Sequence, residues 1–267
     1  MRTRTLILIA AGALFALICI LAAALWPRSG EPVSGPVDST AGRAQEQVPL
    51  EELTAAQILD RVASTYASCE SYRDTGVVKT VFIESDEARH TTEKSFKTAF
   101  VRPDRFRFEY TKTSYGQQQR YIIWADGNEV LRWSDIRPGV ERPESLGLAL
   151  VAATGVSGGS AHTIPRLLLP EQVRGRRLTD LPAAERVENR QIDGATCLRV
   201  KGSVLGQPTT VWIDRETFAV RRIDGQKALP GFRTEETTTY EPVLNEPVPS
   251  EMLEFNPPDA GDGSRRR

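Results

Sequence analysis

An alternation of apolar and polar residues with a period of two constrains this chain more than any other feature. At positions 105–110 the sequence reads Arg-Phe-Arg-Phe-Glu-Tyr, so aromatic and charged side chains alternate. Successive side chains of a β-strand point to opposite faces, and the segment therefore predicts a strand with one buried and one solvated face. The same alternation continues through most of the chain after Cys69. It favours a sheet over a helical bundle.

Two series of strands follow from this pattern. The first is predicted over residues 76–84, 91–101, 105–112, 119–125 and 129–134, and the second over 184–191, 196–204, 209–214, 219–224 and 233–240. Turn residues such as Asp126-Gly127-Asn128 and Asp193-Gly194 separate the strands and suit the positive φ of tight hairpins. Because the links are short, neighbouring strands are expected to pair antiparallel.

Helical periodicity appears in two places. Thr54 can cap a helix whose apolar positions recur every three or four residues, at Ile58, Leu59, Val62, Ala63 and Tyr66. Between residues 144 and 185, leucine-rich stretches flank a Gly/Ser segment, which predicts two or three short helices around a hinge at Gly155, Gly158 and Gly159. The expected fold class is mainly β (α+β), with a curved antiparallel sheet and a few short helices.

The N-terminus carries an apolar segment without charge from Leu6 to Trp26, preceded by Arg2 and Arg4. At about 1.5 Å per residue it is long enough to cross a hydrocarbon layer of roughly 30 Å. Residues 1–27 are therefore expected to be a signal anchor that holds the chain in the cytoplasmic membrane as a single-pass protein, with its C-terminal domain in the periplasm or at the cell exterior. A cleaved signal and a soluble periplasmic form stay open, since Ala22-Ala23-Ala24 offers small residues to a signal peptidase.

The remaining chain divides by composition. Residues 28–50 are rich in Pro, Gly, Ser, Glu and Gln and predict a flexible linker. Residues 51–258 are enough for one domain with its own core. The Pro-rich stretch from Pro242 to Pro258 predicts an edge segment that closes the sheet. Residues 259–267 are expected to be a disordered tail.

Composition also narrows the function. Lys and Arg number 34 against 35 Asp and Glu, so no cationic face for nucleic acid is expected. The sequence has two isolated His, so no metal site is expected. It has no phosphate-binding loop, so no cofactor is expected either. The segment Gly155-Val-Ser-Gly-Gly159 matches the pattern of a hydrolase nucleophile elbow, but it follows a predicted helix instead of a strand. It is interpreted as the hinge, and no catalytic residue is expected.

Two cysteines, Cys69 and Cys197, lie outside the apolar N-terminal segment. Export brings an oxidising compartment within reach, so a disulfide between them is expected. The alternative is a pair of separate buried thiols that pack as small apolar groups.

Four segments carry a family resemblance, in the order 100–110, 124–128, 211–217 and 245–255. Their sequences are Phe-Val-Arg-Pro-Asp-Arg-Phe-Arg-Phe-Glu-Tyr, Trp-Ala-Asp-Gly-Asn, Val-Trp-Ile-Asp-Arg-Glu-Thr and Asn-Glu-Pro-Val-Pro-Ser-Glu-Met-Leu-Glu-Phe. In this order they resemble the LolA/LolB-type lipoprotein-carrier superfamily, which includes the lipid-binding domains of RseB-like regulators. The resemblance covers residues 53–258 and implies a curved antiparallel unclosed β-barrel with a helical lid, whose concave apolar side accepts acyl chains.

The resemblance also implies site residues. In the family an arginine directly before a proline bonds to the lid, and Arg102 matches this position; the alternative is a surface arginine beside a turn. Ten apolar side chains are candidates to line the cavity, although they could equally fill a core. They are Phe96, Phe100, Phe106, Phe108, Tyr110, Trp124, Trp133, Leu167, Leu168 and Trp212.

The expected function is non-catalytic binding of acyl chains or of a lipoprotein's lipid at the periplasmic face of the cytoplasmic membrane. Expected partners are the lipid, the membrane itself through the N-terminal helix, and a membrane protein, but no nucleic acid. An envelope sensor or protein-interaction domain of the RseB-like kind, with no transported lipid, is the alternative.

Overall fold

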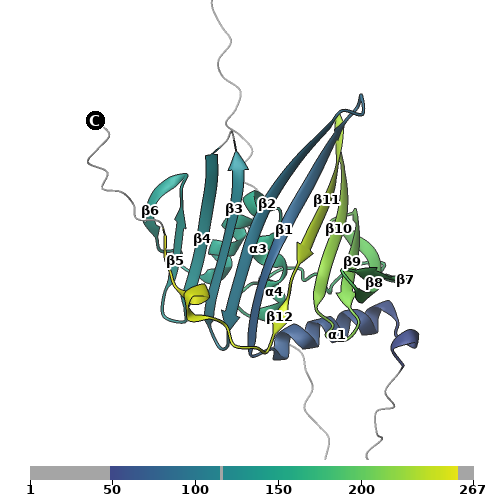
Figure 1. Ribbon diagram of the computed structural model, residues 1–267, viewed down its shortest axis with the longest axis horizontal. Helices are drawn as coiled ribbons and strands as arrows, with labels where there is room; N and C mark the ends of the chain where they lie inside the picture. Colours follow the sequence, from purple (N-terminus) through teal and green to yellow (C-terminus); the bar gives the residue numbers. More distant parts are fainter. Residues whose placement is uncertain (1–48, 115–116, 258–267) are drawn as a thin grey trace, which may run out of the picture. The chain divides into compact units, whose positions relative to one another are not determined.

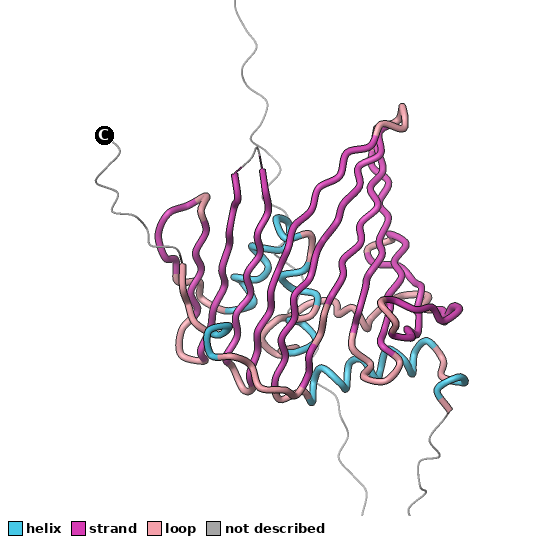
Figure 2. Tube along the Cα trace, viewed as in Figure 1, coloured by secondary structure: helices cyan, strands magenta, loops and turns pink. Residues whose placement is uncertain are grey.

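The computed structural model describes residues 49–114 and 117–257. In these ranges the protein is mainly β, with one large sheet and a few helices gathered against one of its faces (Figures 1 and 2). The predicted anchor, most of the predicted linker and the predicted tail lie outside the described residues. No helix within the described ranges has both the length and the apolar character needed to cross a membrane.

The sheet has twelve strands in the described part of the chain. They are β1 (Ser71–Glu84), β2 (Arg89–Val101), β3 (Arg105–Ser114), β4 (Gln117–Asp126), β5 (Val130–Ser134), β6 (Arg137–Glu141), β7 (Glu185–Ile192), β8 (Ala195–Val204), β9 (Gln207–Asp214), β10 (Val220–Leu229), β11 (Phe232–Tyr240) and β12 (Val243–Leu244). The helices are α1 (Ala55–Ser68), α2 (Leu146–Ser157), α3 (Ser160–Thr163) and α4 (Pro165–Leu168), with single 3-10 turns η1 (Leu50–Glu52) and η2 (Ser250–Leu253).

The strand order is β6-β5-β4-β3-β2-β1-β11-β10-β9-β8-β7, and β12 pairs separately with β1. Neighbouring strands pair antiparallel, as at Gly76 opposite Tyr240 in the central β1–β11 pair. The terminal strands β6 and β7 do not pair with each other, so the sheet stays unclosed. The predicted antiparallel, unclosed sheet is confirmed.

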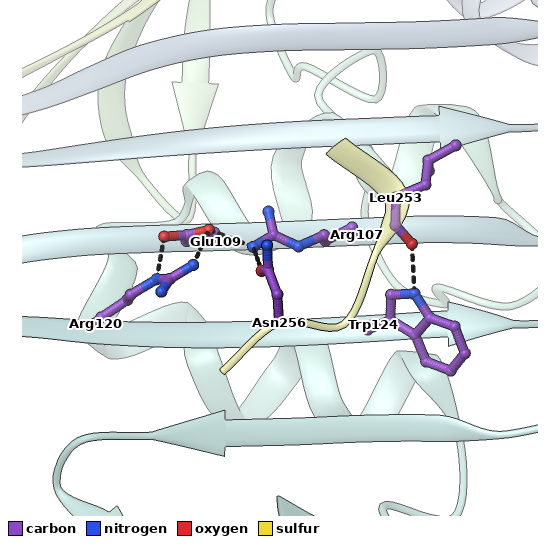
Figure 3. Close-up of polar contacts among 6 residues, drawn as sticks. All are labelled: Arg107, Glu109, Arg120, Trp124, Leu253 and Asn256. Carbon is purple, nitrogen blue, oxygen red and sulfur yellow. Dashed lines mark hydrogen bonds and ion pairs between the residues drawn. The ribbon is translucent and has the colours of Figure 1, made fainter. Parts of the chain in front are cut away.

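The Pro-rich C-terminal stretch does not form an edge, and that prediction is wrong. β12 pairs with Tyr72 of the central strand β1, just beyond the end of β11. The following residues then cross the face of the sheet opposite the helices (Figure 1). There the indole Nε1 of Trp124 donates a hydrogen bond to the carbonyl oxygen of Leu253 at 2.7 Å, and Arg107 Nη2 donates to Asn256 Oδ1 at 2.9 Å (Figure 3).

Helix α1 begins as the sequence predicts. Thr54 Oγ1 accepts a hydrogen bond from the backbone N–H of Gln57 at 3.3 Å, while Gln57 Oε1 accepts one from the N–H of Thr54 at 2.9 Å. This reciprocal capping box satisfies two N–H groups that the first turn leaves free. At the other end, the hydroxyl of Tyr66 accepts a hydrogen bond from the N–H of Val220 on β10 at 3.0 Å. The helix is thereby joined to the second half of the sheet.

The two faces of the sheet differ in what covers them. We call the face that packs against α1 to α4 the covered face, and the face crossed by the C-terminal segment the outer face. On the covered face, Gly76 lets the rings of Phe96 and Tyr240 approach to 5.4 Å between centroids, because a Cβ at Gly76 would lie 2.2 Å from Phe96 Cζ. A missing side chain in the middle of β1 therefore makes room for an aromatic pair.

Candidate functional site

The aromatic side chains of β2 and β3 meet on the covered face. Alternate residues of a strand point to one side, which brings together Phe96, Phe100, Phe106, Phe108 and Tyr110. Leu167 and Leu168 of α4 belong to the same buried cluster. Seven of the ten predicted cavity residues therefore lie in one apolar layer between sheet and helices.

This layer is filled by the protein's own side chains. Phe100, Phe106 and Phe108 have a relative exposure of 0%. A void wide enough for water would leave accessible surface on the side chains around it. Of the two alternatives for these side chains, a lined cavity and a filled core, this conformation therefore has the filled core.

The three tryptophans lie elsewhere, which corrects their prediction as cavity residues. Trp124 is on the outer face, where it contacts the C-terminal segment (Figure 3). Trp133 shares that face, since it lies opposite Ile122, two residues from Trp124 on β4. Trp212 lies between two arginine guanidinium groups, at 4.2 and 5.1 Å from its ring centroid. Its neighbours on β9, Val211 and Ile213, point instead to the covered face.

Helix α2 is apolar on every side. No charged residue occurs between Leu146 and Ser157. Its buried side packs on the cluster, while the opposite side leaves Leu148 and Val151 exposed at 55% and 56%. A surface helix normally presents a polar stripe to solvent. The exposed side of α2 lacks one.

Two glycines connect α2 to α3. Gly158 and Gly159 have φ angles of 65° and 85°, in the left-handed region that favours glycine. A Cβ at Gly158 would also lie 2.8 Å from Val78 Cγ1 on β1. Gly155, predicted to belong to the hinge, lies inside α2 with no neighbour within 4 Å of a Cβ built on it. Of the three predicted hinge glycines, Gly158 and Gly159 therefore lie at the break between α2 and α3. We call α2 to α4 together the cover.

Arg102 joins two parts of the helical layer. Its Nε donates to the carbonyl oxygen of Cys69 at 2.9 Å, and its Nη2 donates to that of Ala67 at 2.9 Å, both at the end of α1. The same Nη2 lies 3.4 Å from the carbonyl oxygen of Leu168 in α4. The contact with the lid that the family resemblance implies is thus present in the geometry. Whether it holds the lid shut stays a prediction.

A buried carboxyl group lies under the cover and escaped the sequence analysis. Asp74 Oδ2 accepts a hydrogen bond from the hydroxyl of Tyr72 at 2.7 Å, and Oδ1 accepts one from the N–H of Thr98 at 2.9 Å. Burial raises the pKa of Asp74 to about 6, although these two hydrogen bonds act to lower it. The sequence offered one signal of its burial: Asp74 lies an even number of positions from Tyr72 and Val78, and therefore points to the same face of β1 as these apolar residues.

The serine-containing motif does not form a nucleophile elbow. Ser157 is buried, its Oγ donates to the carbonyl oxygen of Thr154 at 3.3 Å, and it accepts from the N–H of Ala161 at 3.1 Å. His162 Nδ1 contacts Thr154 Oγ1 at 3.0 Å instead of the serine. Burial, and to a lesser degree the charge of Arg166, lowers the pKa of His162 to about 4. Ser157 and His162 are therefore no nucleophile and base pair.

The predicted disulfide is not formed, because Cys69 and Cys197 are both free, buried thiols. Cys69 directly follows α1, close to the start of β1, and Cys197 lies on β8, four strands further along the sheet. At about 4.8 Å between neighbouring strands this is a separation of roughly 19 Å. A disulfide needs Cα atoms within about 7 Å.

Hollows among the described residues border the apolar layer in two places. One, with a volume of about 480 Å³, lies on the outer face over Gly76 and is bordered by the turn at Asp193. The other, of about 910 Å³, lies between the β4–β5 turn and the first residues of α2. Among the residues that the structure describes, no group of three or more His, Cys, Asp and Glu could hold a metal ion.

No protein-family model matches the sequence, and no curated protein matches it. Solved structures similar to the chain include LprF from Mycobacterium bovis, at 12% sequence identity over 73% of this chain and 94% of that protein, with a TM-score of 0.40. Lipoprotein LppX from Mycobacterium tuberculosis is similar at 12% identity over 73% and 97%, with a TM-score of 0.39. A LolA superfamily protein from Nitrosomonas europaea is similar at 11% identity over 76% and 98%, with a TM-score of 0.29. Similarity at this level says nothing of what this chain binds.

Proposed function

We propose that this chain is a non-catalytic binding protein that holds an acyl chain, or the lipid of a lipoprotein, between its sheet and α2 to α4. The observation that carries the proposal is the cover itself. It is apolar toward the sheet, apolar on the exposed side of α2, and broken at Gly158 and Gly159. Because α2 contains no charged residue, its exposed side can contact a lipid without exposing a charge to it.

Opening the cover exposes two sets of buried side chains: its own, such as Leu150, Leu167 and Leu168, and the aromatic side chains of the sheet. A bound acyl chain covers this surface again and itself gains about 0.8 kcal/mol for each methylene buried. The empty protein therefore favours the closed, filled state.

Binding is expected beside a membrane. The apolar segment from Leu6 to Trp26 motivates a location at the periplasmic face of the cytoplasmic membrane, with this segment as the anchor. Fractionation of cells with an antibody against the C-terminal domain tests this part independently. Recovery of a shortened chain in the soluble periplasmic fraction would contradict the anchor and favour a cleaved signal.

A locked cover tests the binding mode. A Cβ at Gly158 would lie 3.6 Å from Val78 Cβ, within the separation that a disulfide requires. We expect the oxidised double variant Val78→Cys/Gly158→Cys to lose uptake of the fluorescent fatty acid cis-parinaric acid, and to regain it on reduction. Each single variant serves as a control for strain at Gly158. Equal uptake by the oxidised and reduced forms would show that the ligand does not enter beneath the cover.

A second candidate function follows from the filled interior. Because Phe100, Phe106 and Phe108 are already buried, the same sheet can serve as a solid scaffold for a protein partner in an envelope sensor. Purification of the full chain from native membranes separates the two functions. A stoichiometric protein partner without co-purified lipid would favour the sensor.

A further inference from the structure

Two lysines lie directly opposite each other on the covered face. Lys94 on β2 is paired in register with Lys112 on β3. Two residues further along the same strands, Phe96 is paired with Tyr110. Because residues two apart share a face, the cationic pair continues directly from the aromatic pair.

This lysine pair is unfavourable for the protein alone. Like charges at directly opposite positions of neighbouring strands repel each other and destabilise a sheet. Both side chains are half-buried. Burial lowers the pKa of Lys94, the carboxylate of Glu236 acts to raise it, and the charge of Lys112 lowers it to a smaller degree. Within the ranges 49–114 and 117–257, neither lysine forms an ion pair with a carboxylate.

A third polar group extends the row. Gln119 on β4 lies opposite Lys112, and its Oε1 is buried without a hydrogen-bond partner among the described residues. The unsatisfied Oε1 needs a donor, which a lysine ammonium of the row can supply, and the Nε2 of the same amide can then donate to an anion.

The row starts where the helical cover ends. Val78 on β1 is paired with Lys94, and the same Val78 lies against Gly158 at the break between α2 and α3. Glu236 of β11 lies at the same break, on the other side of β1: its Oε2 would be 3.5 Å from a Cβ at Gly158, and it accepts a hydrogen bond from Thr80 at 3.1 Å. An anion is therefore favoured on the side of Lys94 that faces Lys112, away from this carboxylate.

We propose that Lys94, Lys112 and Gln119 bind the anionic headgroup of an amphiphile, a carboxylate or a phosphate, whose acyl chain lies along the covered face. The inference rests on the proposed function and names the class of its ligand. A shift of two residues along a strand is about 6.6 Å. The first methylenes after the headgroup therefore reach Phe96 and Tyr110.

The test compares an acid with its uncharged ester. Binding of cis-parinaric acid and of its methyl ester is measured by fluorescence for the wild-type chain and for the double variant Lys94→Met/Lys112→Met, which keeps the apolar stems. We expect the wild type to prefer the acid by about tenfold or more, as for hydrogen bonds to charged groups. The double variant should lose this preference and keep its affinity for the ester. Lys97→Ala, an exposed lysine on the other face of β2, should behave like the wild type.

The outcomes separate the two proposals. A wild type that binds acid and ester equally overturns the headgroup site and leaves the proposed function standing, as does a double variant that weakens both ligands alike. A wild type that binds neither ligand ends both proposals.

Competition with dodecanoate and dodecyl phosphate identifies the headgroup. The stronger competitor has the preferred group, and both should compete less well against the double variant. Inorganic phosphate should compete far more weakly than dodecyl phosphate, since it lacks the acyl chain. Equal competition by the two phosphates would overturn the assignment to an amphiphile.

Discussion

The guanidinium of Arg102 lies 3.4 Å from the carbonyl oxygen of Leu168 and at the same time donates hydrogen bonds to carbonyl groups at the end of α1. One side chain thus connects the cover to the helix that packs beside it. Its position directly before Pro103 places it at the end of β2, where the sheet meets both helices.

Replacement of Arg102 should loosen this junction. We expect Arg102→Ala to lower the free energy of unfolding by about 2–4 kcal/mol, because several partly buried carbonyl groups lose a charged donor. Amide hydrogen exchange should rise most in α4. Urea unfolding and mass-resolved hydrogen exchange measure both effects. Arg105→Ala, at an exposed arginine of β3, is the control and should change little. Faster exchange spread evenly over the domain would contradict a specific role at the cover.

Gly76 should not tolerate a side chain. A Cβ there would lie 2.2 Å from Phe96 Cζ and 2.4 Å from the carbonyl oxygen of Thr239. We expect Gly76→Ala to destabilise the protein by about 1–3 kcal/mol, the usual cost of overpacking. Gly225→Ala on β10 is the matched control, since nothing lies within 4 Å of a Cβ built on it. Similar unfolding midpoints for the two variants would show that the Phe96–Tyr240 pair adapts.

Asp74 should make stability depend on pH. Its pKa in the folded protein, about 6, lies above its ordinary value of 3.8, so the folded state binds this proton more tightly than the unfolded state. The contribution to stability is complete below about pH 4 and is lost as the pH rises through about 6, by roughly 3 kcal/mol. Urea unfolding of wild type and Asp74→Asn should show the difference between them shifting in favour of the variant over this interval. If the stabilities of wild type and Asp74→Asn change in parallel with pH, the pH dependence comes from a group other than Asp74.

The two described cysteines should be unreactive in the native protein. Burial raises the pKa of Cys69 to about 11, despite the nearby charge of Arg102, and burial also raises the pKa of Cys197. Iodoacetamide should label both only after unfolding, as followed by peptide mass spectrometry. A reductant should leave the melting temperature unchanged, whereas loss of a native disulfide typically costs about 2–5 kcal/mol. A lower melting temperature under reducing conditions would show that a bridge exists.

Local signals made the individual elements predictable. The capping pair of Thr54 and Gln57 fixes the start of α1 within the sequence itself. Alternation over residues 105–110 predicted which side chains of β3 are buried, because successive side chains of a strand point to opposite faces. Strand β6 was missed since Pro138 and Gly139 interrupt any alternation. The segment at β12 is only two residues long.

How these elements pack together was harder to predict from the sequence. Both faces of β4 carry apolar residues, so alternation alone could not tell that Trp124 faces the C-terminal segment while Ile123 faces the helices. The pairing of cysteines depends on strand order, which places β8 far from β1. Whether an apolar layer is hollow depends on how the helices pack, and no pattern along the chain records that.

An unclosed sheet has two borders with free N–H and C=O groups, and both are poor templates for another strand. At one border, β6 contains Pro138, which has no N–H group to offer. At the other, β7 carries four charged side chains in eight residues and an irregular register between Val187 and Arg190. Charges, bulges and proline are the devices by which natural sheets avoid fibrillar aggregation. The domain is thus protected from self-association along both margins of its sheet.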